Sequence, residues 1–293
     1  MPIQFNTCES AECDLSEWSI GDPVASQLID ALAYLYLRQE RNAQNVIEAL
    51  EPKLRPSRGQ VSENVIRKLT APDPKYIEIM ASGSQDEKEN AEKMAKKEVE
   101  RRDGLLFQHL SWIAARLSIP NGVQTPPHVR SADKGFDGFI IEMNEENDAL
   151  ERIVLCEDKA SIAPRSLITS SVWKEIKAIR AGERDDEILA DLTTLVSRVA
   201  EGDEDQAEAI VDEALWEEVR QFRVSVATGE NIRRDGSFGH VLSGFKEVAP
   251  GEIKTRTGSI LPFDDVRKGL GELAIAVSNR VYEITEGAGE RHV

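Results

Sequence analysis

Two short apolar segments near the middle of the chain constrain its fold more than any other feature. Residues 135–143 read GFDGFIIEM, residues 152–160 read RIVLCEDKA, and the polar stretch NEENDALE separates them. Each run has the length and apolar content typical of a strand, and the short polar link favours a hairpin-like pair. Because helical patterns flank this pair on both sides, we expect an α/β protein.

The spacing of apolar residues predicts most of the remaining elements. The predicted helices cover residues 26–54, 86–117, 167–179, 185–199, 205–220 and 263–284, and an alternating pattern predicts a strand over 222–228. The first 25 residues read as irregular, and no strand pattern is evident between Ile119 and Asp133. The segment 229–251 is rich in glycine and basic residues, which is typical of a mobile loop.

A change of character between Leu69 and Gln85 marks a candidate domain boundary. Pro72 and Pro74 interrupt this stretch, and the connector-like sequence ASGSQ ends it. We therefore expect a mostly helical N-terminal region over residues 1–82. A second domain over residues 83–293 would end in the C-terminal helix.

The charge of the chain limits its partners. Its 53 acidic and 36 basic residues give a net charge of −17, which repels a polyanion over most of the surface. A nucleic-acid role must then be confined to a local cleft or patch, or depend on a partner. No apolar run is long enough for a membrane span and the start lacks a secretory pattern, so we expect a cytoplasmic protein without membrane contact. Three cysteines without zinc-type spacing indicate neither a disulfide framework nor a zinc site.

Three charged residues mark the ends of the two predicted strands. Asp137 lies near the start of the first strand, and Glu157 and Lys159 lie at the end of the second. Side chains alternate along a strand, so Glu157 and Lys159 share one face, and pairing of the two strands brings Asp137 beside them. Two neighbouring carboxylates fit a hard cation such as Mg²⁺, which activates water for attack on a phosphodiester, and Lys159 would orient that water or stabilise charge on the phosphate.

The order of these features resembles the core of the PD-(D/E)xK nuclease superfamily. A helix, a strand with Asp, a strand ending in Glu-x-Lys, a helix and a strand follow one another between Asp86 and Thr228. The resemblance implies a restriction-endonuclease-like core, a mixed sheet flanked by helices, with an additional N-terminal helical region. It implies that Asp137 and Glu157 bind Mg²⁺ or Mn²⁺, that Lys159 is the catalytic lysine, and that an acid of the first helix joins them. Asp103, on the same face as Leu106 and Leu110, is the favoured acid, and Glu100 is less well placed.

The family also implies a function and partners. Its members include restriction-type and anti-phage nucleases, so the resemblance implies an endonuclease that cuts DNA, acting in a bacterial defence system. Such an enzyme must be restrained in its own cell. Together with the acidic surface and the extra N-terminal region, this suggests a regulatory protein such as a helicase or a sensor, or a homodimer.

The Glu-x-Lys triplet alone carries little weight. The same spacing occurs at Glu51–Lys53, Glu175–Lys177 and Glu252–Lys254. The first contains a proline near a helix end, the second lies within a predicted helix, and the third lacks an apolar run before the acid. Only the set at Asp137 combines an apolar strand, a triplet at its end and a helix afterwards, although an ordinary ion pair remains the alternative interpretation.

Two groups of basic residues are candidates for phosphate contact. His128, Arg130 and Lys134 precede Asp137 closely in the sequence, where a cleft edge and a solvated loop are about equally expected. A second group consists of three cations among the glycines of segment 229–251, namely Arg233, Arg234 and Lys246.

Two rival functions stay open. The same α/β scaffold suits a non-catalytic protein that binds another protein through its helical layers. A metal-dependent enzyme that acts on a small phosphate or nucleotide is a weaker alternative, which the acidic surface would hinder less than it hinders DNA binding.

Overall fold

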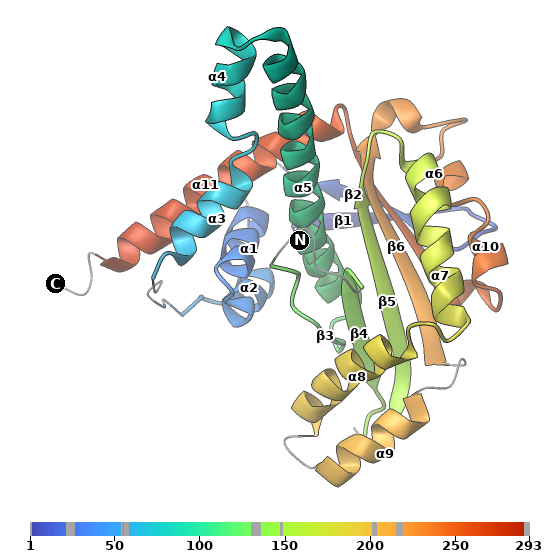
Figure 1. Ribbon diagram of the computed structural model, residues 1–293. Coiled ribbons are helices and arrows are strands. Elements are labelled where there is room, and N and C mark those ends of the chain that lie inside the picture. The colour runs from blue at the N-terminus through green and yellow to red at the C-terminus, as the bar shows by residue number, and fades with distance from the viewer. Residues whose placement is uncertain are drawn as a thin grey trace.

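The computed structural model describes residues 2–21, 27–53, 55, 59–129, 136–146, 149–200, 204–214 and 219–289 (Figure 1). Its centre is a seven-stranded mixed sheet in the order β1-β2-β7-β6-β5-β4-β3. The strands are β1 (Ile3–Cys8), β2 (Asp14–Ile20), β3 (Val123–Gln124), β4 (Gly138–Met143), β5 (Leu150–Ala160), β6 (Arg220–Gly229) and β7 (Arg256–Phe263). Helices pack on both faces, so the predicted α/β class, with a mixed sheet flanked by helices, is confirmed.

The strand pairing places the candidate site at one end of the adjoining inner strands β4 and β5. β4 and β5 are antiparallel, with Gly138 opposite Cys156, which confirms the predicted hairpin-like pair. β5, β6, β7 and β2 run parallel, while β3 and β1 pair antiparallel with their neighbours at the two edges. The apolar part of β5 ends at Cys156, and the residues that follow, Glu157 to Ala160, lie between α5 (Gln85–Ser118) on one face of the sheet and α7 (Trp173–Arg180) on the other.

Two helical layers enclose the sheet (Figure 1). One face packs against the helices that follow β5 and against α10, which follows β6. These are α6 (Pro164–Leu167), the π-helical turn η2 (Ile168–Val172), α7 (Trp173–Arg180), α8 (Asp185–Val199), α9 (Glu204–Ala214) and α10 (Phe245–Val248). The other face packs against helices that include α1 (Gln27–Tyr36), α3 (Val61–Leu69), α5 (Gln85–Ser118) and α11 (Val266–Gly289). The short α2 (Glu40–Ile47) lies against α1, and α4 (Pro74–Ser82) lies against the start of α5.

The N-terminal part of the chain differs most from the sequence-based expectation. The helix predicted over 26–54 is two helices, separated at Arg38, whose φ of 59° is left-handed and ends α1. The connector after Leu69 contains α4, which starts at Pro74 with Asp73 as its cap. The irregular start is in fact β1 and β2, which join the sheet through β7. The domain boundary at residue 82 stays a prediction.

Segment 229–251 is packed against the sheet. Short helical turns, Glu230–Ile232 and Gly239–Leu242, precede α10, and the side chains of Phe238, Leu242 and Phe245 are fully buried. The prediction of a mobile loop is therefore wrong for this segment. The glycines and polar residues around these three apolar side chains hide the apolar pattern in the sequence.

Of the helices in the described ranges, none combines the length and the apolar character that a membrane span requires.

Candidate active site

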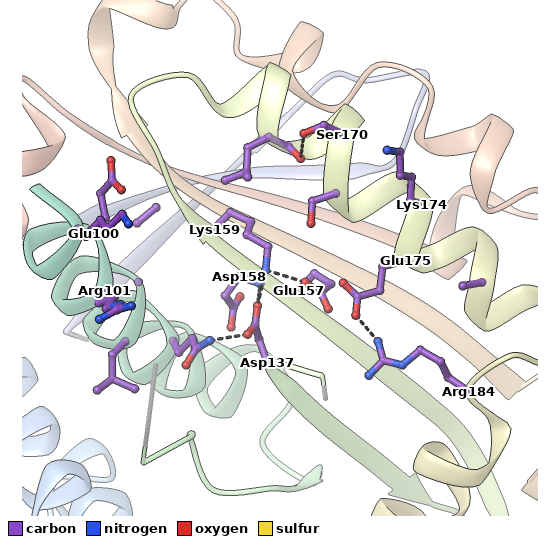
Figure 2. A pocket seen from close by; sticks show the side chains of 18 of the residues that line it. Glu100, Arg101, Asp137, Glu157, Asp158, Lys159, Ser170, Lys174, Glu175 and Arg184 are labelled. Carbon is purple, nitrogen blue, oxygen red and sulfur yellow. Dashed lines mark hydrogen bonds and ion pairs between the residues drawn. The ribbon is translucent and has the colours of Figure 1, made fainter. Parts of the chain in front are cut away.

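A pocket of about 1060 Å³ opens between α5 on one side and η2 and α7 on the other (Figure 2). The ends of β4 and β5 form its floor, where Asp137, Glu157, Asp158 and Lys159 lie. The lining thus combines residues of α5, Asp137, the end of β5 and the helices that follow β5. The predicted cluster at the strand ends is brought together at this floor.

Lys159 joins the two predicted carboxylates. Its Nζ lies 2.9 Å from Asp137 Oδ2 and 2.8 Å from Glu157 Oε2, and it donates a hydrogen bond to each (Figure 2). The three side chains are largely shielded, with exposed fractions of 11% for Asp137, 5% for Glu157 and 21% for Lys159. The ammonium therefore occupies the place between the carboxylates that a cation is expected to take.

The alternation of β5 sorts the charges between the two faces of the sheet. Glu157 and Lys159 project toward α7, on the face where Leu155 packs, as predicted. Asp158 projects to the α5 side, where Ser111 Oγ donates to its Oδ1 over 2.6 Å. The backbone N–H of Asp158 donates to Asp137 Oδ2 over 2.9 Å, so the strand itself fixes the orientation of Asp137.

Burial and the charge of Asp137 raise the pKa of both acids of β5. Burial, reinforced by the charge of Asp137, raises the pKa of Glu157 far above its usual range, although Lys159 opposes the shift. Burial also raises the pKa of Asp158 to about 6, with Arg223 acting in the opposite direction. Burial by itself would lower the pKa of Lys159, but the attraction of Glu157 and Asp137 is stronger and raises it, so Lys159 stays charged at neutral pH.

Gln108 is a residue of the site that the sequence patterns did not indicate. Its Nε2 donates a hydrogen bond to Asp137 Oδ1, the oxygen that Lys159 leaves free. Its Oε1 is buried and has no hydrogen-bond partner among the described residues. A buried acceptor without a partner is uncommon in proteins and suits a site that receives a donor from a ligand or a water.

Glu175 and Arg184 form the α7 side of the floor. Arg184 is held by ion pairs with Glu175 and Glu187, and its guanidinium lies 4.3 Å from the ring centre of Phe136. The charge of Glu175 contributes to raising the pKa of Glu157, after burial and Asp137. Glu175 belongs to a Glu-x-Lys triplet within a helix, as predicted, yet this helix points the acid into the same pocket.

Asp103 does not belong to this cluster. It is fully buried on another side of α5, where Arg102 Nη2 lies 2.6 Å from its Oδ1 and Arg267 Nη1 lies 2.7 Å from its Oδ2. The structure therefore does not bring Asp103 to the Asp137–Glu157 pair that it is predicted to join as a metal ligand. α5 is buried along more than one face, so an inward-facing acid can point to α11 as well as to the strands, and it is Glu100 that lines the pocket.

The basic residues expected at the cleft edge lie elsewhere or outside the described residues. His128 does not line the pocket, and it lies within electrostatic range of His109 and Asp191. Arg130 and Lys134 lie outside the described residues. In the second group, Arg233 is already bound to Glu17 and Glu230.

The other Glu-x-Lys triplets lack this setting. Glu252 and Lys254 form an exposed ion pair of 2.8 Å beside the helical turn Ile253–Thr255. Glu51 and Lys53 follow the end of α2 and do not line the pocket. Of the four triplets, only Glu157–Lys159 ends a central strand.

The donor set of the floor fits a hard divalent cation. Within the described ranges, no group of three or more His, Cys, Asp or Glu side chains is arranged to hold a metal ion. Mg²⁺, however, usually keeps several waters and takes only one or two protein carboxylates. Asp137 and Glu157 supply two carboxylates that share Lys159 as a cationic partner, which is the number of protein carboxylates that Mg²⁺ usually takes.

In comparisons with known proteins, no family model, no curated protein and no solved structure matches this chain.

Proposed function

We propose that the protein is a metal-dependent nuclease that hydrolyses phosphodiester bonds of DNA at the floor of this pocket. The observation that carries the proposal is the contact of Lys159 with both Asp137 and Glu157. Two carboxyl groups and an ammonium, shielded at the end of two adjoining strands inside an open pocket, combine oxygen donors for a cation with a fixed positive charge next to them.

Asp137 and Glu157 would hold Mg²⁺ or Mn²⁺ through carboxylate oxygens. When bound, such an ion polarises a phosphodiester and makes a bound water more acidic. Gln108 and the backbone N–H of Asp158 keep Asp137 oriented, and the burial of Glu157 keeps bulk water from its carboxylate. The chain thus provides oriented oxygen donors before any ligand enters.

Lys159 supplies the second part of the chemistry. Because its pKa is raised, it stays protonated and is unsuited to remove a proton from water. Its ammonium instead donates hydrogen bonds to the attacking water or to a phosphate oxygen, where negative charge grows as the bond breaks. The same ammonium balances the two carboxylates when no substrate is present.

The order of elements supports a restriction-like core. The predicted order of helix, strand, strand, helix and strand corresponds to α5, β4, β5, α7 and β6, with the site at the β4–β5 junction. The sequence pattern lacked a first strand, and β3 adds a short one beside β4. Under this proposal the chain works in antiviral defence with a regulatory protein, such as a helicase or sensor, or as a homodimer.

A cleavage assay with a matched control tests the proposal. Purified protein is incubated with supercoiled plasmid and with single-stranded circular DNA in Mg²⁺ or Mn²⁺, alone and with the products of neighbouring genes. We expect nicking or linearisation by the wild type and by Lys254→Ala, which removes the lysine of the exposed Glu-x-Lys triplet. Lys159→Ala should lose the activity.

The rival interpretation is a non-catalytic scaffold in which Lys159 only neutralises buried acids. It receives support from the same contacts, because a closed ion pair satisfies all three groups without a ligand. Under it, no DNA is cut in any condition, and Glu157→Gln leaves function in cells intact. Cutting that survives Lys159→Ala would also reject the proposed site.

A further inference from the structure

Three cations line the walls of the pocket above its floor. Lys97 and Arg101 lie on α5, Lys174 lies on α7, and all three line the pocket and are exposed. None of them forms an ion pair with a described residue. The cations of the floor differ, because Lys159 and Arg184 are bound to acids.

The positions of these cations follow from helix geometry. Lys97 and Arg101 are four residues apart on α5, so they lie one turn apart on a single face. Across the pocket, η2 inserts a π-helical turn between α6 and α7, and Ser170, Ser171 and Lys174 follow one another along the wall there. π-helical turns within helices frequently occur at functional sites. The two walls therefore present cations and hydroxyls above an acidic floor (Figure 2).

We propose that the pocket binds single-stranded DNA by its sugar-phosphate backbone, with Lys97 and Arg101 holding phosphates at one wall and Lys174 at the other. This inference rests on the proposed nuclease function and names the form of its substrate. It adds residues that line the pocket to the predicted phosphate contacts, of which His128 does not line the pocket and Arg130 and Lys134 lie outside the described residues. The strand crosses from α5 to α7, and one phosphate between the two walls faces Lys159.

The recess of the floor favours a single strand over a duplex. Only 5% of the Glu157 side chain and 11% of the Asp137 side chain are exposed. A phosphate must therefore enter between the two helices to reach them. The pocket volume of about 1060 Å³ is close to the upper end of the range for small-ligand pockets, about 300–1000 Å³, which suits a few nucleotides and not a rigid duplex.

The lining also indicates how the strand is recognised. Among the described residues that line the pocket, none is aromatic. Stacking of bases on aromatic side chains supplies much of the affinity in many single-strand binding proteins, and that contribution is missing here. Binding must then depend on phosphate charge, which makes it independent of base sequence and strongly dependent on salt.

Fluorescence anisotropy tests the path of the strand without requiring cleavage. A labelled single-stranded oligonucleotide of about 20 nucleotides, longer than typical single-strand sites, is titrated in EDTA over a series of salt concentrations. The test variant is Lys97→Gln/Arg101→Gln/Lys174→Gln. The matched control is Lys93→Gln/Lys96→Gln/Lys177→Gln, which removes the same charge from exposed residues of α5 and α7 that do not line the pocket.

We expect the wild type and the control to bind the single strand more tightly than a duplex of the same length. In the test variant, the slope of log affinity against log salt should become shallower by about two, since each lost phosphate contact to a single strand removes about 0.7. Equal slopes in the test and control variants, tighter binding to the duplex, or no binding by the wild type would overturn the inference.

The two proposals can fail separately. If the slope changes as expected but no DNA is cut in Mg²⁺ or Mn²⁺, the binding path holds and the nuclease function is rejected. If DNA is cut in a Lys159-dependent manner but the test variant binds and cuts as the control does, the nuclease function holds and this path is rejected.

Discussion

The ammonium of Lys159 lies 2.9 Å from Asp137 Oδ2, across a strand junction that separates the two residues by 22 positions. The same oxygen of Asp137 also accepts a hydrogen bond from the backbone N–H of Asp158, so Asp137 is bound to β5 at two points. Removing one member of this cluster therefore affects both folding and chemistry.

Glu157 should make the protein less stable as the pH rises. Its pKa in the folded state is raised from 4.5 to about 8, mainly by burial, so the folded protein retains a proton that the unfolded chain releases. The free energy of unfolding should then fall as the pH rises from about 4.5 to about 8, by up to about 1.4 kcal/mol per pH unit. Urea unfolding across this range should show a shallower fall for Glu157→Gln, and an equal fall would contradict the assignment.

Gln108 should act as a positioning residue through Asp137. Gln108→Leu removes the donor to Asp137 Oδ1 and leaves the contacts of Lys159 and Asp158 in place. Losing one hydrogen bond to a carboxylate, worth about 1.5 kcal/mol, should lower kcat about tenfold and raise the half-saturating Mg²⁺ concentration, with little change in KM for DNA. A variant that changes only thermal stability, with kcat and metal dependence unaltered, would show that Gln108 is merely structural.

Asp103 should matter for stability and not for metal binding. Asp103→Asn leaves Arg102 and Arg267 without their shared carboxylate in a buried position. Breaking a buried pair in this way should lower the free energy of unfolding by about 3 kcal/mol, measured by urea denaturation. At a temperature where the variant is folded, its Mg²⁺ dependence should equal that of the wild type, and a large shift would restore Asp103 as a metal ligand.

Thiol labelling checks the placement of β5 independently of any function. Cys156 is buried, and burial raises the pKa of its thiol to about 12, while the pKa of Cys13 is raised to about 11 for the same reason. Cys8 is partly exposed. Because the thiolate is the reactive form, a disulfide reagent at pH 8 should label Cys8 first in the native protein and all three cysteines in denaturant. Early labelling of Cys156 would contradict the structure.

The central strand pair and its charged end could be predicted because strand geometry leaves few choices. If residues 135–143 and 152–160 form paired strands, alternation places Glu157 and Lys159 on one face and Asp137 beside them, and the structure agrees. α5 is equally predictable, because the apolar spacing from Leu106 to Leu117 is a local signal.

The rest of the site depends on how each helix is rotated about its axis. Gln108 and Glu175 reach the floor from α5 and α7, and no local pattern states which face of a helix will meet a strand end. Asp103 shows the same ambiguity, since it faces inward but toward α11. Strands β1 and β2 were missed because few of their residues are buried; β1 buries only Ile3. β1 is an edge strand of the sheet, and in β2 only Leu15 and Trp18 are buried.

The proposed nuclease function depends most on the binding of a divalent cation by Asp137 and Glu157. Calorimetric titration with Mn²⁺ measures it directly, with the wild type compared with Asp137→Asn, Glu157→Gln and the surface control Glu252→Gln. Because the burial of Glu157 favours its neutral form, the glutamine variant should remain folded. The account predicts one saturable site in the wild type and in Glu252→Gln that is lost in the other two variants. Equal Mn²⁺ binding by all four proteins, or no saturable site in the wild type, would contradict it.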